Sequence, residues 1–327
     1  MKPLLATLLA LCLAAPAPAR AADPTGTLVL YTSQPDKVAA ETVRAFEKTS
    51  PGVTVKVYRS GTTQVMNKLA AEFLAGAPQP DVLLIADSMS MQALKQQGRL
   101  LPDPTVSVAG FPEGSYDPDR TYFGTKLITT GIAYNTHAPF VPRNWADLTK
   151  PAAKGEVVMP DPLYSGAAMI TLGSFAQDKS LGFGFYEALA KDGATTSPGN
   201  GGVLRAVASG QKMFGMVVDF MALNAAAKGS PVRFVFPADG VTAVTEPVAI
   251  LKTAHNIAAA RAFVAFLLSR QGQELAARQG FLPAMRGVTP PPSFPAKLDL
   301  KLMPLDVAAL LAHQDALKQR FTALFGG

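Results

Sequence analysis

The chain has 327 residues, a formal net charge of +6 and a single cysteine. Its 30 lysines and arginines are scattered without a polybasic run, which argues against a nucleic-acid-binding surface. One cysteine excludes a disulfide scaffold and a thiolate metal site, so the fold must rest on a hydrophobic core, which a chain of this length can build, usually as two domains.

Residues 1–21 have the pattern of a secretory signal peptide. Lys2 makes the start positive, residues 4–15 are apolar, and a small-residue A-x-A pattern ends at Ala21. The apolar run is too short to span a bilayer, so we predict an exported protein with a cleaved signal. Cleavage would remove Lys2, Arg20 and the cysteine, leaving +4 of the formal charge of +6.

Apolar runs and amphipathic stretches alternate over residues 27–97. This pattern predicts strands over 27–31, 53–58 and 81–86, and helices over 37–48, 64–75 and 88–97. A β-α-β-α-β-α order is typical of an α/β unit with a largely parallel sheet.

A second α/β unit follows a proline-rich loop and lies between two long β-like runs, 121–136 and 243–252. Three helices then end the chain. The predicted strands are 156–159, 213–220 and 232–236, and the predicted helices are 167–177, 183–191, 202–209, 221–227, 256–269, 271–279 and 305–323. We therefore predict two α/β lobes joined by a two-strand hinge, with lobe 1 over 22–128 plus 247–327 and lobe 2 over 129–246.

Two Ser-Gly pairs stand where a predicted strand meets a predicted helix, one in each lobe. They are Ser60-Gly61 and Ser165-Gly166. Ligands of open α/β sheets bind at the carboxyl ends of strands, and free N–H groups with hydroxyl donors at a helix start favour an anion. The alternative is a structural one, because serine and threonine are ordinary helix caps, worth about 1 kcal/mol. The sequence leaves both interpretations open.

Two carboxylates stand at similar places. Asp219 ends an apolar strand, where it can cap the next helix or accept hydrogen bonds from a ligand's hydroxyl or ammonium groups. Glu246 lies in the second β-like run, where a charge needs a partner or water. It can form a salt bridge between the lobes or contact the ligand.

No set of catalytic residues is evident. His137, His255 and His313 lack metal-ligand spacing, and the chain has no HExxH motif, Walker loop or Gly-x-Ser-x-Gly turn. We therefore predict a protein that is not an enzyme and that uses no cofactor and no metal.

Several segments together resemble the type 2 periplasmic solute-binding proteins of ABC importers. They include "LVLYTSQ", "PDVLLIAD", "DPLYSGAA", "AVASGQKMFGMVVDF" and the long "SPGVTVKVYRSGTTQVMNKLAAE". This group includes binders of ferric ion, thiamine, 2-aminoethylphosphonate and hexose phosphate. The resemblance implies a monomeric periplasmic protein whose two lobes close on a solute and which delivers it to an inner-membrane ABC permease, with no nucleic-acid partner.

The residues that would distinguish an iron binder are different in this chain. Ferric binders of the group use an adjacent tyrosine pair in the second lobe, where this sequence has Asp219-Phe220-Met221, and Pro35 stands where a histidine can occur. We therefore predict a small anionic solute, a phosphate or phosphonate ester such as a sugar phosphate or 2-aminoethylphosphonate. Ferric-ion or thiamine binding is the alternative within the group, and a secreted phosphoesterase is the alternative outside it.

The predicted ligand-binding residues fall into three sets. The anion would be held by Ser33, Ser60, Gly61, Thr62, Thr63, Ser165, Gly166 and Ala167. The far end of the solute would be held by Asp219 and Glu246, and the walls would be lined by Tyr31, Tyr164 or Phe220.

Overall fold

The structure, a computed structural model, describes residues 23–295 and 300–326. The predicted signal peptide, including Cys12, lies outside the described residues. Within the described ranges, no helix combines the length and the apolar character that crossing a membrane requires.

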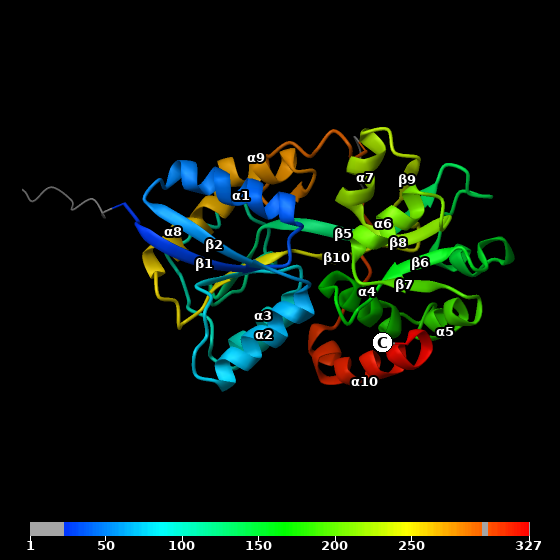
Figure 1. Ribbon diagram of the computed structural model, residues 1–327, viewed down its shortest axis with the longest axis horizontal. Helices are drawn as coiled ribbons and strands as arrows, with labels where there is room; N and C mark the ends of the chain where they lie inside the picture. The colour runs from blue at the N-terminus through cyan, green and yellow to red at the C-terminus, as the bar shows by residue number, and fades with distance from the viewer. Residues whose placement is uncertain (1–22, 296–299, 327) are drawn as a thin grey trace, which may run out of the picture.

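The first sheet has five strands in the order β2-β1-β3-β11-β4, of which β1 and β2 are labelled in Figure 1 beside helix α1. Their bounds are β1 (Gly26–Thr32), β2 (Val53–Arg59), β3 (Val82–Leu84), β4 (Tyr122–Gly124) and β11 (Pro247–Ile250). The first three strands run parallel, as predicted, and β11 is antiparallel to both of its neighbours. The helices of this unit are α1 (Asp36–Thr49), α2 (Thr62–Leu74), α3 (Ser88–Gln96), α8 (Ile257–Leu268) and α9 (Arg270–Arg278).

Alternating burial gives this sheet two covered faces. Leu28 and Leu30 of β1 belong to one apolar cluster, in which Phe46 of α1 packs edge-on against Phe263 of α8. Tyr31 belongs to a separate cluster with residues of α2 and α3. The strand therefore forms because both of its faces find apolar partners, at the period of two that a strand requires.

The second sheet is built around the long strand β5 (Lys126–Asn135). Its path is β10-β5-β8-β6-β7, and β9 and β12 also pair with β5. These strands are β6 (Val157–Pro160), β7 (Thr195–Ser197), β8 (Phe214–Val218), β9 (Val232–Val235), β10 (Thr242–Val244) and β12 (Leu282–Pro283). Its helices are α4 (Gly166–Gln177), α5 (Gly184–Lys191), α6 (Asn200–Ala208) and α7 (Asp219–Ala227), with 3₁₀ turns at Trp145–Thr149 and Pro151–Ala153.

The chain crosses between the two sheets twice, within the two long β-like runs of the sequence. The first run divides at Thr125 into β4 and β5, and the second divides at residues 245–246 into β10 and β11. Thr125 ties the crossings together, because its hydroxyl donates to the carbonyl of Glu246 at 2.8 Å. The first crossing lies a few residues before the predicted lobe boundary at 128, and the second lies at the predicted one.

The C-terminal helix α10 (Val307–Phe325) packs on the second unit, although the sequence grouped residues 247–327 with the first. Leu310 and Phe321 are buried in the same apolar cluster as Phe175 of α4 and Tyr186 of α5. Figure 1 shows α10 below α4 and α5, and α10 also contacts α3 of the first unit. The apolar face of an amphipathic helix packs against an apolar surface that other elements leave uncovered. The position of the helix along the chain does not determine which unit provides that surface.

Candidate functional site

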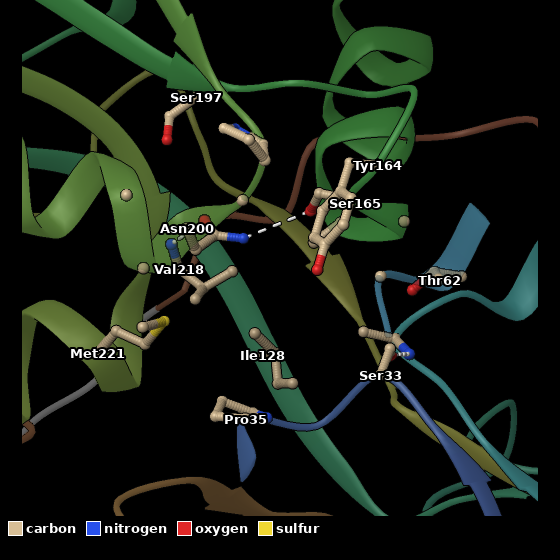
Figure 2. A pocket seen from close by; sticks show the side chains of 18 of the residues that line it. Ser33, Pro35, Thr62, Ile128, Tyr164, Ser165, Ser197, Asn200, Val218 and Met221 are labelled. Atoms are coloured by element: carbon tan, nitrogen blue, oxygen red, sulfur yellow. Dashed lines mark hydrogen bonds between the residues drawn. The ribbon is translucent and has the colours of Figure 1, made fainter. Parts of the chain in front are cut away.

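A cavity of about 330 Å³ lies between the two units. The first unit contributes the loop after β1 and the end of β2, and the second contributes the starts of α4, α6 and α7. Figure 2 shows Ser33 and Thr62 at the right, Tyr164, Ser165 and Asn200 above and to the left of them, and Ile128 of β5 in the lower centre. The site is therefore made by both units and exists only when they lie together.

Five helices begin at the wall of this cavity. Residues of the first turn or the cap of α1, α2, α4, α6 and α7 all line it. Each helix N-terminus carries about half a positive charge and several N–H groups without an intrahelical acceptor. Within the described residues, the N–H groups of Thr62, Gly166 and Ala167 have no acceptor. The cavity is therefore suited to negative charge.

Eight of the twelve residues in the predicted ligand-binding set line the cavity. They are Ser33, Gly61, Thr62, Tyr164, Ser165, Gly166, Ala167 and Glu246. Phe220, which was also considered for the walls, lines it as well. Their contact with a solute stays a prediction.

The other four predicted residues have partners elsewhere and do not line the cavity. Tyr31 donates to Glu72 Oε1 at 2.6 Å, on the far side of the first sheet. The N–H of Ser60 donates to Thr32, and that of Thr63 donates to the carbonyl of Tyr164 at 3.5 Å. Asp219 is buried, and its Oδ2 accepts from the N–H and the hydroxyl of Thr129 at 3.0 and 2.7 Å. Tyr31 and Asp219 thus use their side chains, and Ser60 and Thr63 their backbone N–H groups, in contacts within the protein, and none of the four lines the cavity.

The serines of the two Ser-Gly pairs differ in whether they cap the helix that follows, which was the structural alternative to ligand binding. The side chain of Ser165 accepts a hydrogen bond from Ala168 N–H and caps α4. At the other pair the cap position is Gly61, so no side chain caps α2, and the helix already includes Thr62 and Thr63. Ser165 thus acts as a cap and lines the cavity, while Ser60 does neither.

The two Ser-Gly loops touch one another across the cavity mouth. A Cβ atom placed on Gly166 would lie 2.7 Å from the carbonyl oxygen of Ala86 and 2.9 Å from Asp87 Cβ. One placed on Gly61 would lie 2.6 Å from the carbonyl oxygen of Tyr164. All three distances are shorter than the contacts that Cβ atoms make in proteins, so glycine at these positions permits the two units to meet.

Glu246 is held in a buried ion pair at the second crossing between the sheets. Its Oε2 lies 2.7 Å from Lys126 Nζ, and both side chains are less than 5% exposed. Gln34 Nε2 donates to the same carboxylate at 3.0 Å, and Lys126 Nζ also lies 4.1 Å from the ring centre of Phe281. The salt-bridge interpretation of Glu246 is therefore confirmed, and the carboxylate also borders the cavity.

Two arginines of the cavity wall were not among the residues predicted from the sequence. Arg59 ends β2, and Arg205 lies in α6. Arg59 directly precedes the Ser60-Gly61 pair, so the neighbouring residues could have indicated it. Arg205 follows the turn at residues 197–202 by three residues, and its position on the cavity depends on how α6 packs. The same turn contributes Asn200, whose amide donates to Ser165 Oγ at 3.4 Å (Figure 2).

Asp219 gives a prediction about stability and pH. Burial raises the pKa of its carboxyl group to about 7, against the opposing effect of the hydrogen bonds from Thr129 and Phe220. Between the ordinary value of 3.8 and about 7, the folded protein then binds a proton that the unfolded chain has lost. Stability should fall as pH rises through this window, and Asp219→Asn should remove that fall. Melting temperatures of both proteins from pH 4 to 8 test this, and parallel curves would contradict it.

Within residues 23–295 and 300–326, no group of three or more histidine, cysteine, aspartate or glutamate side chains is placed to hold a metal ion. The carboxylates that line the cavity are Asp36 and Glu246, and both lie near a cation.

Comparison with known proteins gives a consistent fold. The sequence profile described as bacterial extracellular solute-binding protein matches residues 27–282. The phosphoglycerate transport regulatory protein PgtC of Salmonella typhimurium is 29% identical over 213 residues, which are 62% of this chain and 52% of that protein. The chain thus spans about half the length of that relative.

Two solved structures show the same architecture. The periplasmic binding protein AfuA of Actinobacillus pleuropneumoniae, with fructose-6-phosphate bound, has a TM-score of 0.83 and 24% identity, covering 91% of this chain and 98% of that one. Iron-bound HitA of Pseudomonas aeruginosa has a TM-score of 0.78 and 22% identity, covering 91% and 99%. The predicted two-lobed α/β fold of periplasmic binding proteins is confirmed, and at these identities the likeness concerns the fold alone.

Proposed function

The chain belongs to the bacterial extracellular solute-binding protein family, and from that premise we propose that it captures a small organic phosphate or phosphonate ester for an ABC importer. It would bind the solute in the periplasm as a monomer and deliver it to an inner-membrane permease. Binding of this kind requires no covalent chemistry.

The observation that supports an anionic solute best is the convergence of five helix N-termini with two arginines on one cavity. Backbone N–H groups and guanidinium groups form charge-assisted hydrogen bonds with phosphoryl oxygens, each worth about 1.5–3 kcal/mol. The cavity volume of about 330 Å³ is at the lower end of the range for small organic ligands, so an ester fits it better than a bare ion.

Ferric ion is the alternative, because iron-bound HitA has the same fold. A hard trivalent cation prefers several anionic oxygen ligands. The lining offers Tyr164, the exposed Asp36 and the ion-paired Glu246, beside two arginines that would repel a cation. The balance of charge therefore favours the anion.

A phosphoesterase activity has less support in the same geometry. The hydroxyl of Ser165 lies beside the amide of Asn200, which is not a base. None of the histidines lines the cavity.

A ligand screen by thermal shift tests the proposal directly. Fructose 6-phosphate or another phosphate ester should raise the melting temperature, by the equivalent of about 2.7 kcal/mol at a hundred times its Kd. Ferric citrate and thiamine should leave it unchanged. A rise with iron alone would overturn the proposal.

Adjacent threonines provide a matched pair of variants for the same screen. Thr62 lines the cavity, whereas Thr63 does not. Thr62→Val, which removes a hydroxyl and keeps the shape, should weaken binding of the active ester about tenfold, the effect of one charge-assisted hydrogen bond. Thr63→Val should bind as the wild type does. Equal affinities measured by titration calorimetry would exclude this part of the site.

A further inference from the structure

The two arginines of the cavity wall come from different units and keep free donor groups. Arg59 Nε donates to the carbonyl of Gln34 at 2.7 Å and lies 3.7 Å from an oxygen of Asp36. Within the described residues, its two terminal nitrogens have no acceptor. One edge of the Arg59 guanidinium is therefore anchored, and the other edge is open to a ligand in the cavity.

Arg205 lies on the opposite unit, over the start of α6. Its Nη1 and Nη2 would be 3.5 and 3.8 Å from Cβ atoms placed on Gly201 and Gly202. Among the described residues, Arg205 forms no ion pair and donates no hydrogen bond. All three of these residues line the cavity. A second cation, with no protein anion beside it, thus faces the same space as Arg59.

The two carboxylates predicted to hold the far end of the solute, Asp219 and Glu246, both have partners within the protein. Glu246 is in a buried pair with Lys126 and accepts from Gln34. Asp219 accepts from Thr129 and does not line the cavity. Asp36 is 86% exposed and lies beside Arg59. An ammonium group entering the cavity would therefore find each lining carboxylate beside a cation and would meet two guanidinium groups.

We propose that the solute carries a second anionic group at a distance from its phosphate, and that Arg59 and Arg205 determine this specificity. The substrate class is a small phosphorylated carboxylic acid without an amino group. This inference rests on the proposed function, because it assumes that a phosphate ester binds in this cavity. Each arginine pairs with one anionic end of the solute, so the ligand bridges the two units and holds them together.

Three compounds that differ by one group at a time test the proposal by titration calorimetry. Glycerol 3-phosphate has one anionic group, 3-phosphoglycerate adds a carboxylate, and O-phosphoserine replaces the hydroxyl of 3-phosphoglycerate by an ammonium. We expect 3-phosphoglycerate to bind at least about tenfold more tightly than either of the others, the ratio expected for one added charge-assisted contact. Equal or tighter binding of glycerol 3-phosphate or O-phosphoserine would overturn the proposal.

Variants assign the effect to the arginines. Arg205→Gln, on an exposed part of a helix, should reduce the preference for 3-phosphoglycerate over glycerol 3-phosphate to about threefold or less, and Arg59→Gln should do the same. Arg233→Gln, in β9 away from the cavity lining, removes the same charge and should keep the preference. An unchanged ratio in both cavity variants would overturn the assignment. If no phosphate ester binds the wild type while ferric ion does, the proposed function itself fails, which is a different result from binding without preference.

Discussion

Gly166→Ala is expected to weaken solute binding about tenfold or more while leaving the free protein as stable as the wild type. The new methyl group would lie 2.7 Å from the carbonyl oxygen of Ala86 and 3.0 Å from Thr62 Cγ2, both in the other unit. Overlap of this kind costs about 1–3 kcal/mol when neighbouring backbone must shift. The free protein relieves it by a small opening of the lobes, whereas the closed, solute-bound form cannot.

A matched control separates this effect from helix propensity. Gly184 is the first residue of α5, as Gly166 is of α4, and a Cβ atom there meets nothing within 4 Å. Gly184→Ala should bind the solute with wild-type affinity. Calorimetric titration with the ester identified by thermal shift gives the affinities, and thermal unfolding without ligand gives the stabilities. Wild-type affinity in Gly166→Ala would mean that the two loops are apart in the solute-bound protein.

Lys126→Met is expected to lower the free energy of unfolding by about 3–5 kcal/mol, because it leaves the buried carboxylate of Glu246 without its counter-ion. Lys126 begins β5 on the first crossing, and Glu246 stands on the second, at a positive φ of 39°. A non-glycine residue in that conformation is strained, so it persists only while its surroundings hold it. The ion pair, the amide of Gln34 and the hydroxyl of Thr125 are among the contacts that do so.

The double variant Lys126→Met/Glu246→Gln tests whether the loss comes from the unpaired charge. Its neutral amide avoids the cost of a buried anion, so it should recover more than half of the lost stability. Urea unfolding of the wild type and both variants gives the free energies. A loss below about 1 kcal/mol in Lys126→Met, or a double variant no more stable than the single one, would show that the pair has no structural role.

The repeated units were predictable from the sequence because their strands and helices bury residues at simple periods. Helix α1 places Ala39, Val43 and Phe46 on one buried face, as its spacing predicts. The start of α2 was harder. The sequence left Thr62 and Thr63 in a loop, yet they begin the helix, because Gly61 can serve as a cap without any side-chain hydrogen bond.

The points at which the chain crosses from one sheet to the other could not be predicted from the hydrophobic pattern. Residues 121–136 and 243–252 are each one apolar run, and nothing in their period marks the point where the chain changes sheet. Thr125 and Glu246 acquire that role from the hydrogen bond between them. Their position depends on which strands each half of the run pairs with.

The sequence by itself determined the α/β class, the two units and the Ser-Gly turns, since local periodicity and turn residues specify these. Tertiary structure decided which polar side chains share the cavity. It turned Asp219 and Tyr31 toward partners outside it, paired Glu246 with Lys126, and brought Arg59 and Arg205 to one space from positions 146 residues apart in the numbering. The physical reason is that a side chain's partner is set by the packing of whole elements against one another, and a local pattern carries no information about that packing.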